Sequence, residues 1–312
     1  MYMKAILIHQ YGGPEVLQYE ETPVPSIQPD EVLVRVYASG VNPIDWKVRE
    51  GHRSSASRPF PIILGWDFSG VVEKIGSQVT AFTAGDEVYG RPDPSRNGTY
   101  AEYLAVRAGE IARRPASIDH QAAAGVSLAG LTAWQGLFDH GKLQAGQKVL
   151  IQGASGGVGT FAVQFAKWKG AYVIGTASGE NIPFLKELGA DEVIDYKTDA
   201  FEKKLKDIDV VLDTIGGKVQ ANSLKVLKEG GILVSTVGID DEEAVKAKGL
   251  QAIRFMAKSL PDQLQQIAGL IDAGKVRPII AQILPLKDAA EAHRISEKGH
   301  TRGKIILQVN NA

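Results

Sequence analysis

The sequence contains no cysteine among its 312 residues. Disulfide bonds, thiolate nucleophiles and every zinc site with cysteine ligands are therefore excluded. The six histidines offer no substitute, because no two stand three or four positions apart and none belongs to an HExxH motif. We therefore predict that the protein has no metal site.

Long apolar runs and an excess of charge of one sign are also lacking. No stretch reaches the roughly 18 apolar residues of a transmembrane helix, and the first residues, MYMKAILIHQYGG, make a poor signal peptide. The net charge is −1, so no broad basic field favours nucleic acid or acidic membranes. These absences predict a cytoplasmic protein with neither nucleic acid nor membrane as a partner.

The first part of the chain, residues 1 to about 118, is rich in short β-strands. Glu31–Val41 alternates apolar and polar residues, and Phe68–Gly76 and Gly85–Gly90 are further short strands bounded by turn residues. Many short strands with frequent turns are typical of a barrel or a sandwich. A length of 312 residues is enough for about two domains, so a second one should follow.

From residue 119 to about 255 strands and helices alternate, which predicts an α/β fold with a doubly wound parallel sheet. Residues from about 256 onward contain a helix, DQLQQIAGLIDAGK, and a last strand, Gly303–Val309, which we expect to return to the first domain. The strands expected in the alternating part are Val149–Gln152, Tyr172–Thr176, Glu192–Ile194, Val210–Asp213 and Ile232–Thr236.

A glycine cluster follows the first of these strands. It has the AxGxxG form of the dinucleotide fingerprint and precedes a helical pattern, so it lies at a strand-to-helix turn. Backbone N–H groups at the start of such a helix bind a pyrophosphate, and glycine leaves the space that the phosphate needs. The residues predicted to bind the dinucleotide here are Ala154, Ser155, Gly156, Gly157, Val158 and Gly159.

The end of the next strand bears on which dinucleotide is bound. NAD-binding proteins usually have an acidic residue there for the ribose 2′-hydroxyl. This strand ends in Gly175-Thr176-Ala177-Ser178 without an acid, which favours NADPH, with Ser178 and Tyr196 as donors to the 2′-phosphate. Glu180 lies nearby and favours NADH if it points inward; otherwise it is a solvated residue of the first helical turn.

The chain resembles the zinc-independent medium-chain dehydrogenase/reductases, in particular the quinone oxidoreductase (zeta-crystallin-like) and enone reductase group. The resemblance covers nearly the whole chain. It implies a GroES-like β-barrel beside a Rossmann domain, with the cofactor in the cleft between them. The segments that carry it are GVNPIDWKVREG, PIILGWDFSGVVEKIG, GDEVYG, GTYAEY, LAGLTAW, GASGGVG, LGADEVIDY, DVVLDTIGG, GGILVSTVG and GKIIL.

The resemblance also implies which chemistry is absent. Zinc-dependent relatives have a cysteine where this chain has Pro43 and a histidine where it has Trp66, so Trp66 is expected to fill the vacated space. Without a Lewis acid, alcohol oxidation is disfavoured. Hydride donation to an electrophilic acceptor, a quinone or an α,β-unsaturated carbonyl, is favoured instead, with the developing negative charge stabilised by hydrogen-bond donors.

The family pattern places catalytic candidates in VNPIDWK. It implies Asn42 near the nicotinamide or the substrate carbonyl, and Lys47 as in plant enone and alkenal reductases, where it would contact the cofactor and donate to an enolate oxygen. Otherwise Lys47 is an exposed loop lysine. Thr132 is expected near the nicotinamide ribose, or else in helix packing. Further cofactor contacts are expected at two later strand ends, at Gly216, Gly217, Val237 and Gly238.

The sequence thus predicts an NADPH-dependent reductase of small quinones or enones. Two alternatives stay open: an enoyl-thioester reductase of the same superfamily, and a non-catalytic NADPH-binding protein. Asn42 and Lys47 beside an intact glycine motif favour an enzyme, since a pure binding protein needs only the motif. We also predict a homodimer, because the family usually pairs its Rossmann domains edge to edge and an open sheet edge is a liability.

Overall fold

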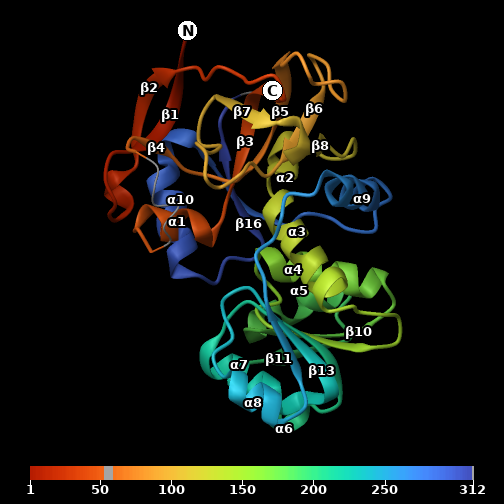
Figure 1. Ribbon diagram of the computed structural model, residues 1–312. Helices are drawn as coiled ribbons and strands as arrows, with labels where there is room; N and C mark the ends of the chain where they lie inside the picture. Colours follow the sequence, from red (N-terminus) through yellow and green to blue (C-terminus); the bar gives the residue numbers. More distant parts are fainter. Residues whose placement is uncertain (53–58, 311–312) are drawn as a thin grey trace. The chain divides into compact units, whose positions relative to one another are not determined.

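A computed structural model describes residues 1–52 and 59–310 of the chain. These residues form two compact units. The first unit comprises Met1–Leu131, Ser259–Gly274 and Pro278–Ala312, and the second comprises Thr132–Lys258 and Lys275–Arg277. Figure 1 shows the elements of both.

The first unit is built from two β-sheets. The smaller sheet has the order β2 (Gln18–Pro23), β1 (Tyr2–Ile8) and β4 (Ile62–Ile63). The larger sheet has the order β15 (Ile280–Pro285), β16 (Lys304–Gln308), β3 (Glu31–Val41), β5 (Asp67–Ile75), β6 (Glu87–Gly90) and β8 (Ile111–Arg113), with β7 (Tyr103–Arg107) also paired to β3. The helices of this unit are α1 (Pro43–Arg49), α2 (His120–Ala124), α9 (Pro261–Asp272), α10 (Ala289–Lys298) and the first residues of α3 (Ser127–Trp134).

Strand β3 is the centre of the larger sheet, because it pairs with β5, β7 and β16. The register of β16 on β3 places Ile306 opposite Gly40, so the last strand of the chain returns to the first unit as expected. Two separate apolar cores pack against this framework. One contains Trp66 and gathers around β1 and α10, and the other contains Phe68 and lies between β3, β5 and β7.

The second unit contains one six-stranded sheet in which every pairing is parallel. Its order is β11 (Glu192–Asp195), β10 (Tyr172–Ala177), β9 (Lys148–Ile151), β12 (Ile208–Asp213), β13 (Leu227–Ser235) and β14 (Gln251–Arg254). This is the 3-2-1-4-5-6 order of a dinucleotide-binding fold. The first five strands were predicted and β14 was not, because its four residues carry no clear alternation.

Helices cover both faces of this parallel sheet. Figure 1 shows α4 and α5 on one side and α7 and α8 on the other. Such coverage explains why the strands are nearly continuous apolar runs rather than alternating ones. The helices of the unit are α4 (Gly157–Trp168), α5 (Ile182–Glu187), α6 (Phe201–Lys204), α7 (Gly217–Val226) and α8 (Glu242–Ala247).

The first boundary between the units lies later than the predicted residue 118. Helix α2 packs against β3 and β5 and therefore belongs with the β-rich unit. Helix α3 then crosses the boundary between Leu131 and Thr132, and a π-helical turn, Gln135–His140, continues it. The second boundary lies after Lys258, and Lys275–Arg277 also belong to the second unit.

Gly303, just before β16, gives a test of how this strand is fixed. Its φ is +83°, and a Cβ there would lie 2.2 Å from the backbone oxygen of Ile279. We expect Gly303→Ala to lower the free energy of unfolding through both the unfavourable φ, at about 1–2 kcal/mol, and overpacking, at about 1–3 kcal/mol.

The matched control is Gly274→Ala in the same unit, where φ is +66° and a Cβ would meet no atom within 4 Å among the described residues. Thermal unfolding of both variants checks the prediction. Equal melting temperatures for the two would show that the close approach to Ile279 does not matter.

Candidate functional site

The start of α4 is the strongest candidate for an anion site in the second unit. Strand β9 ends at Ile151, Gly153 turns the chain with φ of +66°, and α4 begins at Gly157 with Gly156 as its N-cap. Gly156 has no side chain with which to cap the helix. The first N–H groups of a 12-residue helix are therefore available to a ligand, and the helix dipole favours a negative one.

Two glycines of the fingerprint have different tasks. A Cβ on Gly159 would lie 2.3 Å from the backbone oxygen of Gly153 and 2.6 Å from Cα of Ala154, so Gly159 lets α4 pack on the turn. A Cβ on Gly156 would meet only that same oxygen, at 3.4 Å. The space beside Gly156 is therefore open toward an incoming pyrophosphate, as the fit of a dinucleotide requires.

The ends of β10 and β11 lie next to each other and hold the residues predicted to contact a 2′-phosphate. Ala177 is paired with Asp195, so Ser178 and Tyr196 follow at the same edge. Tyr196 is 48% exposed. Ser178 is only 5% exposed, its hydroxyl donates to Oε1 of Glu180 at 3.1 Å, and it accepts from the amide of Asn181 at 2.9 Å.

The orientation of Glu180 matters for cofactor preference. The carboxylate reaches back toward the end of β10 rather than away from it, which is the arrangement that favours a ribose 2′-hydroxyl. Within the strand, however, Gly175–Ala177 carry no acid, as the sequence indicated. The structure thus brings Ser178 and Tyr196 to the same corner, together with the carboxylates of Glu180 and Asp195.

The turn before α7 is occupied by acidic side chains of the protein. Asp213 accepts from the backbone N–H groups of Ile215 and Gly216 at 2.9 and 3.0 Å, and Asp240 accepts from that of Gly217 at 2.7 Å. Both glycines have positive φ, +81° and +55°. Because these N–H groups already donate to carboxylates, the turn before α7 is a poorer candidate for binding phosphate than the start of α4.

Val237 and Gly238 follow the end of β13, as predicted. Their N–H groups approach the hydroxyl of Ser235 at 3.2 and 3.3 Å, and Val237 is 39% exposed. A Cβ on Gly216 would lie 3.0 Å from Cγ2 of Val237, so the turns after β12 and β13 are in contact. The residues predicted at these two strand ends therefore lie together on one edge of the sheet.

In the first unit, Asn42 precedes helix α1 and is 4% exposed. Its side-chain oxygen accepts from Nζ of Lys304 at 2.5 Å, and its amide donates to Oδ2 of Asp67 at 2.9 Å. Both ends of the side chain are thus engaged inside the protein. The second amide hydrogen faces the backbone oxygen of Gly40 at 3.5 Å, so a substrate oxygen would have to compete with that contact.

Lys304 and Asp67 form a buried ion pair at 3.0 Å, with side chains 4% and 0% exposed. Lys304 also donates to the backbone oxygen of Val41 at 3.1 Å, and the second oxygen of Asp67 accepts from the N–H of Leu128 at 2.6 Å. Sequence reasoning did not select either residue. The signal available was that GWDFSG and GKIIL, which contain them, were among the segments carrying the family resemblance.

A second buried chain of hydrogen bonds runs from Asp45 to Arg49. The carboxylate of Asp45 accepts from the N–H of Asn42 at 2.8 Å and from the hydroxyl of Tyr100 at 2.7 Å. Tyr100 in turn contacts Nε2 of His293 at 3.2 Å, and Nδ1 of His293 lies 3.2 Å from Nη1 of Arg49. Because Arg49 only donates, Nδ1 accepts and Nε2 carries the hydrogen.

The pKa shifts agree with this assignment. Burial, together with the Arg49 guanidinium, lowers the pKa of His293 to about 3, so the ring is neutral at pH 7. Burial raises the pKa of Asp45 to about 7, against the opposing effects of Tyr100, the Asn42 N–H and Lys304. Burial also raises the pKa of Tyr100 well above its ordinary value. The tyrosine therefore keeps its proton and donates it to Asp45 in a hydrogen bond.

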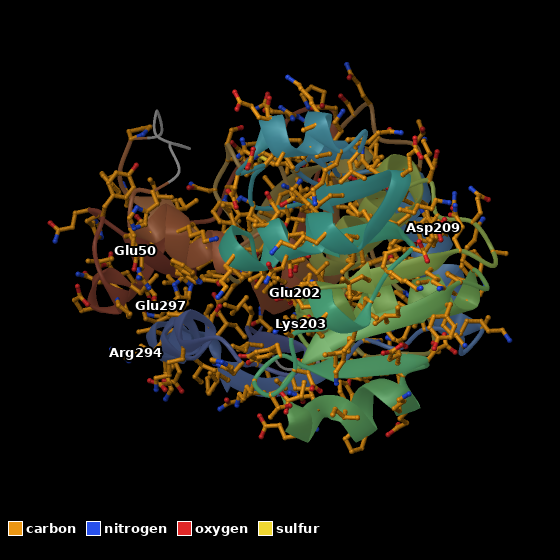
Figure 2. All side chains as sticks on the ribbon, turned by 90° about the horizontal axis from the view of Figure 1, so that it is seen from below. Glu50, Glu202, Lys203, Asp209, Arg294 and Glu297 are labelled. Atoms are coloured by element: carbon orange, nitrogen blue, oxygen red, sulfur yellow. The ribbon has the colours of Figure 1, made fainter. Side chains whose placement is uncertain are left out.

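Arg49 joins α1 to α10, which contact each other. Its guanidinium is fully buried and pairs with Glu50 at 2.7 Å and with Glu297 at 2.6 Å. Figure 2 shows these two glutamates on the same side of the first unit. Together with His293, these contacts hold the end of α1, while Asn42 and Asp45 hold its beginning.

Lys47 therefore stands on a short helix that is fixed at both ends. Its side chain is half-buried, and Nζ lies 5.3 Å from the ring centre of Trp46, within the range of a cation–π contact. It is not the exposed loop lysine of the alternative interpretation. Thr132 is buried at 7% exposure within α3.

The described residues contain no group of three histidine, aspartate or glutamate side chains arranged to hold a metal ion. Trp66 is 1% exposed and packs in the core around β1 and α10. Across the described part of the chain, the helices are too short or too polar to span a membrane.

Two family patterns match the chain. The pattern described as alcohol dehydrogenase GroES-like domain matches residues 28–116, and the pattern described as zinc-binding dehydrogenase matches residues 188–307. The mouse (Mus musculus) protein "NAD(P)H oxidoreductase RTN4IP1, mitochondrial" is 35% identical, over 98% of this chain and 89% of that protein. The Arabidopsis thaliana protein "NADPH-dependent alkenal/one oxidoreductase, chloroplastic" is 37% identical, over 98% and 79%.

A solved structure of a quinone oxidoreductase from Coxiella burnetii superposes with a TM-score of 0.93 at 36% identity, covering 99% of this chain and all of that one. The chain therefore belongs to the zinc-independent medium-chain dehydrogenase/reductases, in the quinone and enone oxidoreductase group. The GroES-like barrel and the Rossmann fold are both confirmed. The relatives support an oxidoreductase that uses a nicotinamide cofactor.

The two fingerprint glycines provide a matched test of the α4 site. Gly156 has φ of −77°, which alanine adopts readily, so we expect Gly156→Ala to fold normally. Its methyl group should lower the affinity for NADPH roughly tenfold or more, equivalent to about 1.4 kcal/mol. Gly159→Ala should instead lower the melting temperature, because its methyl group meets the backbone at 2.3 Å.

Fluorescence titration with NADPH and thermal unfolding of both variants check this. If the folded Gly156→Ala protein binds NADPH as tightly as the wild type, the dinucleotide does not bind at the start of α4.

Proposed function

We propose that the protein is an NADPH-dependent reductase that transfers hydride to a quinone or to an α,β-unsaturated carbonyl compound. The observation that carries the proposal is the uncapped, glycine-rich start of α4 in a sheet of 3-2-1-4-5-6 order. The names of the relatives, an NADPH-dependent alkenal/one oxidoreductase and a quinone oxidoreductase, support the same reaction class.

The geometry of the second unit supports a proposal for the residues that would hold the cofactor. The backbone around Gly156 and Gly157 would bind the pyrophosphate, and the edge formed by Val237 and Gly238 would lie beside the nicotinamide. The nicotinamide supplies the hydride when it is bound. We propose that Thr132, buried in α3, supports the ribose.

Lys47 is proposed as the donor to the acceptor's oxygen. When a conjugated carbonyl or a quinone gains hydride, negative charge develops on its oxygen, and a preorganised donor stabilises that charge. The fixed ends of α1 preorganise Lys47, whereas the side chain of Asn42 is already bonded to Lys304 and Asp67. Asn42 therefore acts in this proposal by holding the start of α1, and solvent supplies the proton.

Changing Lys47→Met keeps most of the side-chain stem and removes the ammonium. We expect kcat and kcat/KM for a small enone to fall together, by about 10²–10³, the range for removing one such donor. Affinity for NADPH should change little. Steady-state kinetics with 2-alkenals and quinones, following NADPH absorbance, measure this.

The control for the lysine is Lys74→Met, which removes an exposed lysine charge from β5 in the same unit. A Lys47→Met protein with normal kcat would show that the lysine is a bystander. A loss of NADPH affinity at unchanged kcat would make it a cofactor contact instead.

Cofactor preference depends on the corner formed by Ser178, Glu180 and Tyr196. We propose that NADPH binds more tightly than NADH, with the Tyr196 hydroxyl and the Ser178 hydroxyl as donors. The Glu180 carboxylate opposes this, because it accepts the Ser178 hydroxyl hydrogen and repels a 2′-phosphate. The carboxylate of Asp195, whose Oδ2 would lie 2.6 Å from a Cβ on Gly179, is in the same corner, so the preference is a balance between two donors and two carboxylates.

Replacing Glu180→Gln removes the charge and should raise affinity for NADPH by about three- to tenfold, as expected for one partly solvated charge pair. Affinity for NADH should stay nearly constant. Titrations of both cofactors at two salt concentrations measure the change, with Glu229→Gln, an exposed glutamate of β13, as control. Equal cofactor affinities in the wild type would refute the preference for NADPH.

The homodimer and the cytoplasmic location stay predictions. Strand β14 is the last strand of the parallel sheet and pairs only with β13 among the described residues, which leaves an edge for a second chain. The relatives' names include mitochondrial and chloroplastic proteins, so they do not support one compartment for this chain.

A further inference from the structure

Two segments of the family pattern, GWDFSG and GKIIL, contain no residue that is proposed above to touch the cofactor or the acceptor. They supply Asp67 and Lys304, which are ion-paired in the interior of the first unit. We infer that Lys304 and Asp67 are a positioning pair, whose contacts set where helices α1 and α3 begin and thereby hold Lys47 for the reaction. This inference rests on the proposed function.

The contacts of the pair converge on two helix starts. Lys304 binds the backbone oxygen of Val41 and the side chain of Asn42, the last two residues before α1. Asp67 binds the Asn42 amide with one oxygen and the N–H of Leu128, the second residue of α3, with the other. One carboxylate therefore joins the beginnings of both helices.

Stability alone does not explain a buried pair of this kind. Removing Lys and Asp from water costs several kcal/mol for each ion, and apolar residues of similar volume are often as stabilising. What the pair adds is a fixed orientation of its two side chains. Lys304 has three acceptors within 3.1 Å, from β3, β5 and the residue before α1, and they leave it one orientation.

The helix start and Lys47 are close along the chain. The N–H of Asn42 also donates to the carboxylate of Asp45. The residue that precedes α1 is therefore held twice, by its N–H at Asp45 and by its side-chain oxygen at Lys304. Lys47 follows five residues after Asn42 on a helix of seven residues. A shift of the opening peptide would move the whole helix, and a displacement of about 1 Å at a reacting group lowers rates by about 10²-fold.

The test separates positioning from stability with three variants. Lys304→Met leaves Asp67 buried without its partner. Lys304→Met combined with Asp67→Asn removes both charges, so that no ion is left unpaired. Val106→Ala, in the core of β7 and away from α1, supplies a control of reduced stability with normal activity.

We expect Lys304→Met to lower the melting temperature and to lower kcat on an enone by about ten- to hundredfold, with KM for the enone changed much less. The double variant should recover most of the melting temperature, while kcat stays low. Recovery of kcat together with the melting temperature would show a merely structural role and would overturn the inference, as would a normal kcat in a folded Lys304→Met protein.

Amide hydrogen exchange gives a readout that does not need the reaction. In the double variant the N–H groups of Asn42 and of residues 44–49 should exchange at least about tenfold faster than in the wild type, whereas in Val106→Ala they should not differ locally. If the wild-type protein reduces neither quinones nor enones, the proposed function fails and the exchange data still decide whether the pair fixes α1. Unchanged exchange at these N–H groups in the double variant would refute the inference by itself.

Discussion

The buried ammonium of Lys304 contacts three oxygens around the start of helix α1, in the candidate site of the first unit. It comes from the last strand of the chain and bonds residues 262 and 237 positions away, Asn42 and Asp67. The first unit is therefore complete only when β16 has paired with β3. Because a buried lysine needs acceptors, Lys304 also holds the Val41 carbonyl and the Asn42 side chain where β3 meets α1.

Around this contact the first unit arranges its polar residues in two connected networks. Asn42 belongs to both, through its side chain to Lys304 and Asp67, and through its N–H to Asp45. The second network continues through Tyr100 and a neutral His293 to Arg49. Lys47 lies on α1 between these two networks. Its side chain is flexible, but the backbone that carries it is fixed at both ends of the helix.

The candidate anion site of the second unit is built differently from the hydrogen-bond networks of the first. It consists of backbone groups at the start of α4 and of glycines that leave room for a ligand, so side-chain charge contributes little to it. At the start of α7 the same kind of turn is closed by Asp213 and Asp240. Among the described residues, the two glycine turns thus differ in that side-chain carboxylates accept from the N–H groups of the turn before α7.

The sequence by itself determined the parallel sheet, the AxGxxG turn and the strand Glu31–Val41, since each of these depends on residues that are neighbours along the chain. The sequence named Ser178 and Tyr196 as donors to a 2′-phosphate, and the structure places them after two neighbouring parallel strands, while their role stays a prediction. Only the tertiary structure decided that Asn42 is bonded to Lys304, that Glu180 turns toward Ser178, and that α2 belongs with the β-rich unit. These depend on partners brought together by folding, and no local spacing encodes which buried acceptor a distant lysine will reach.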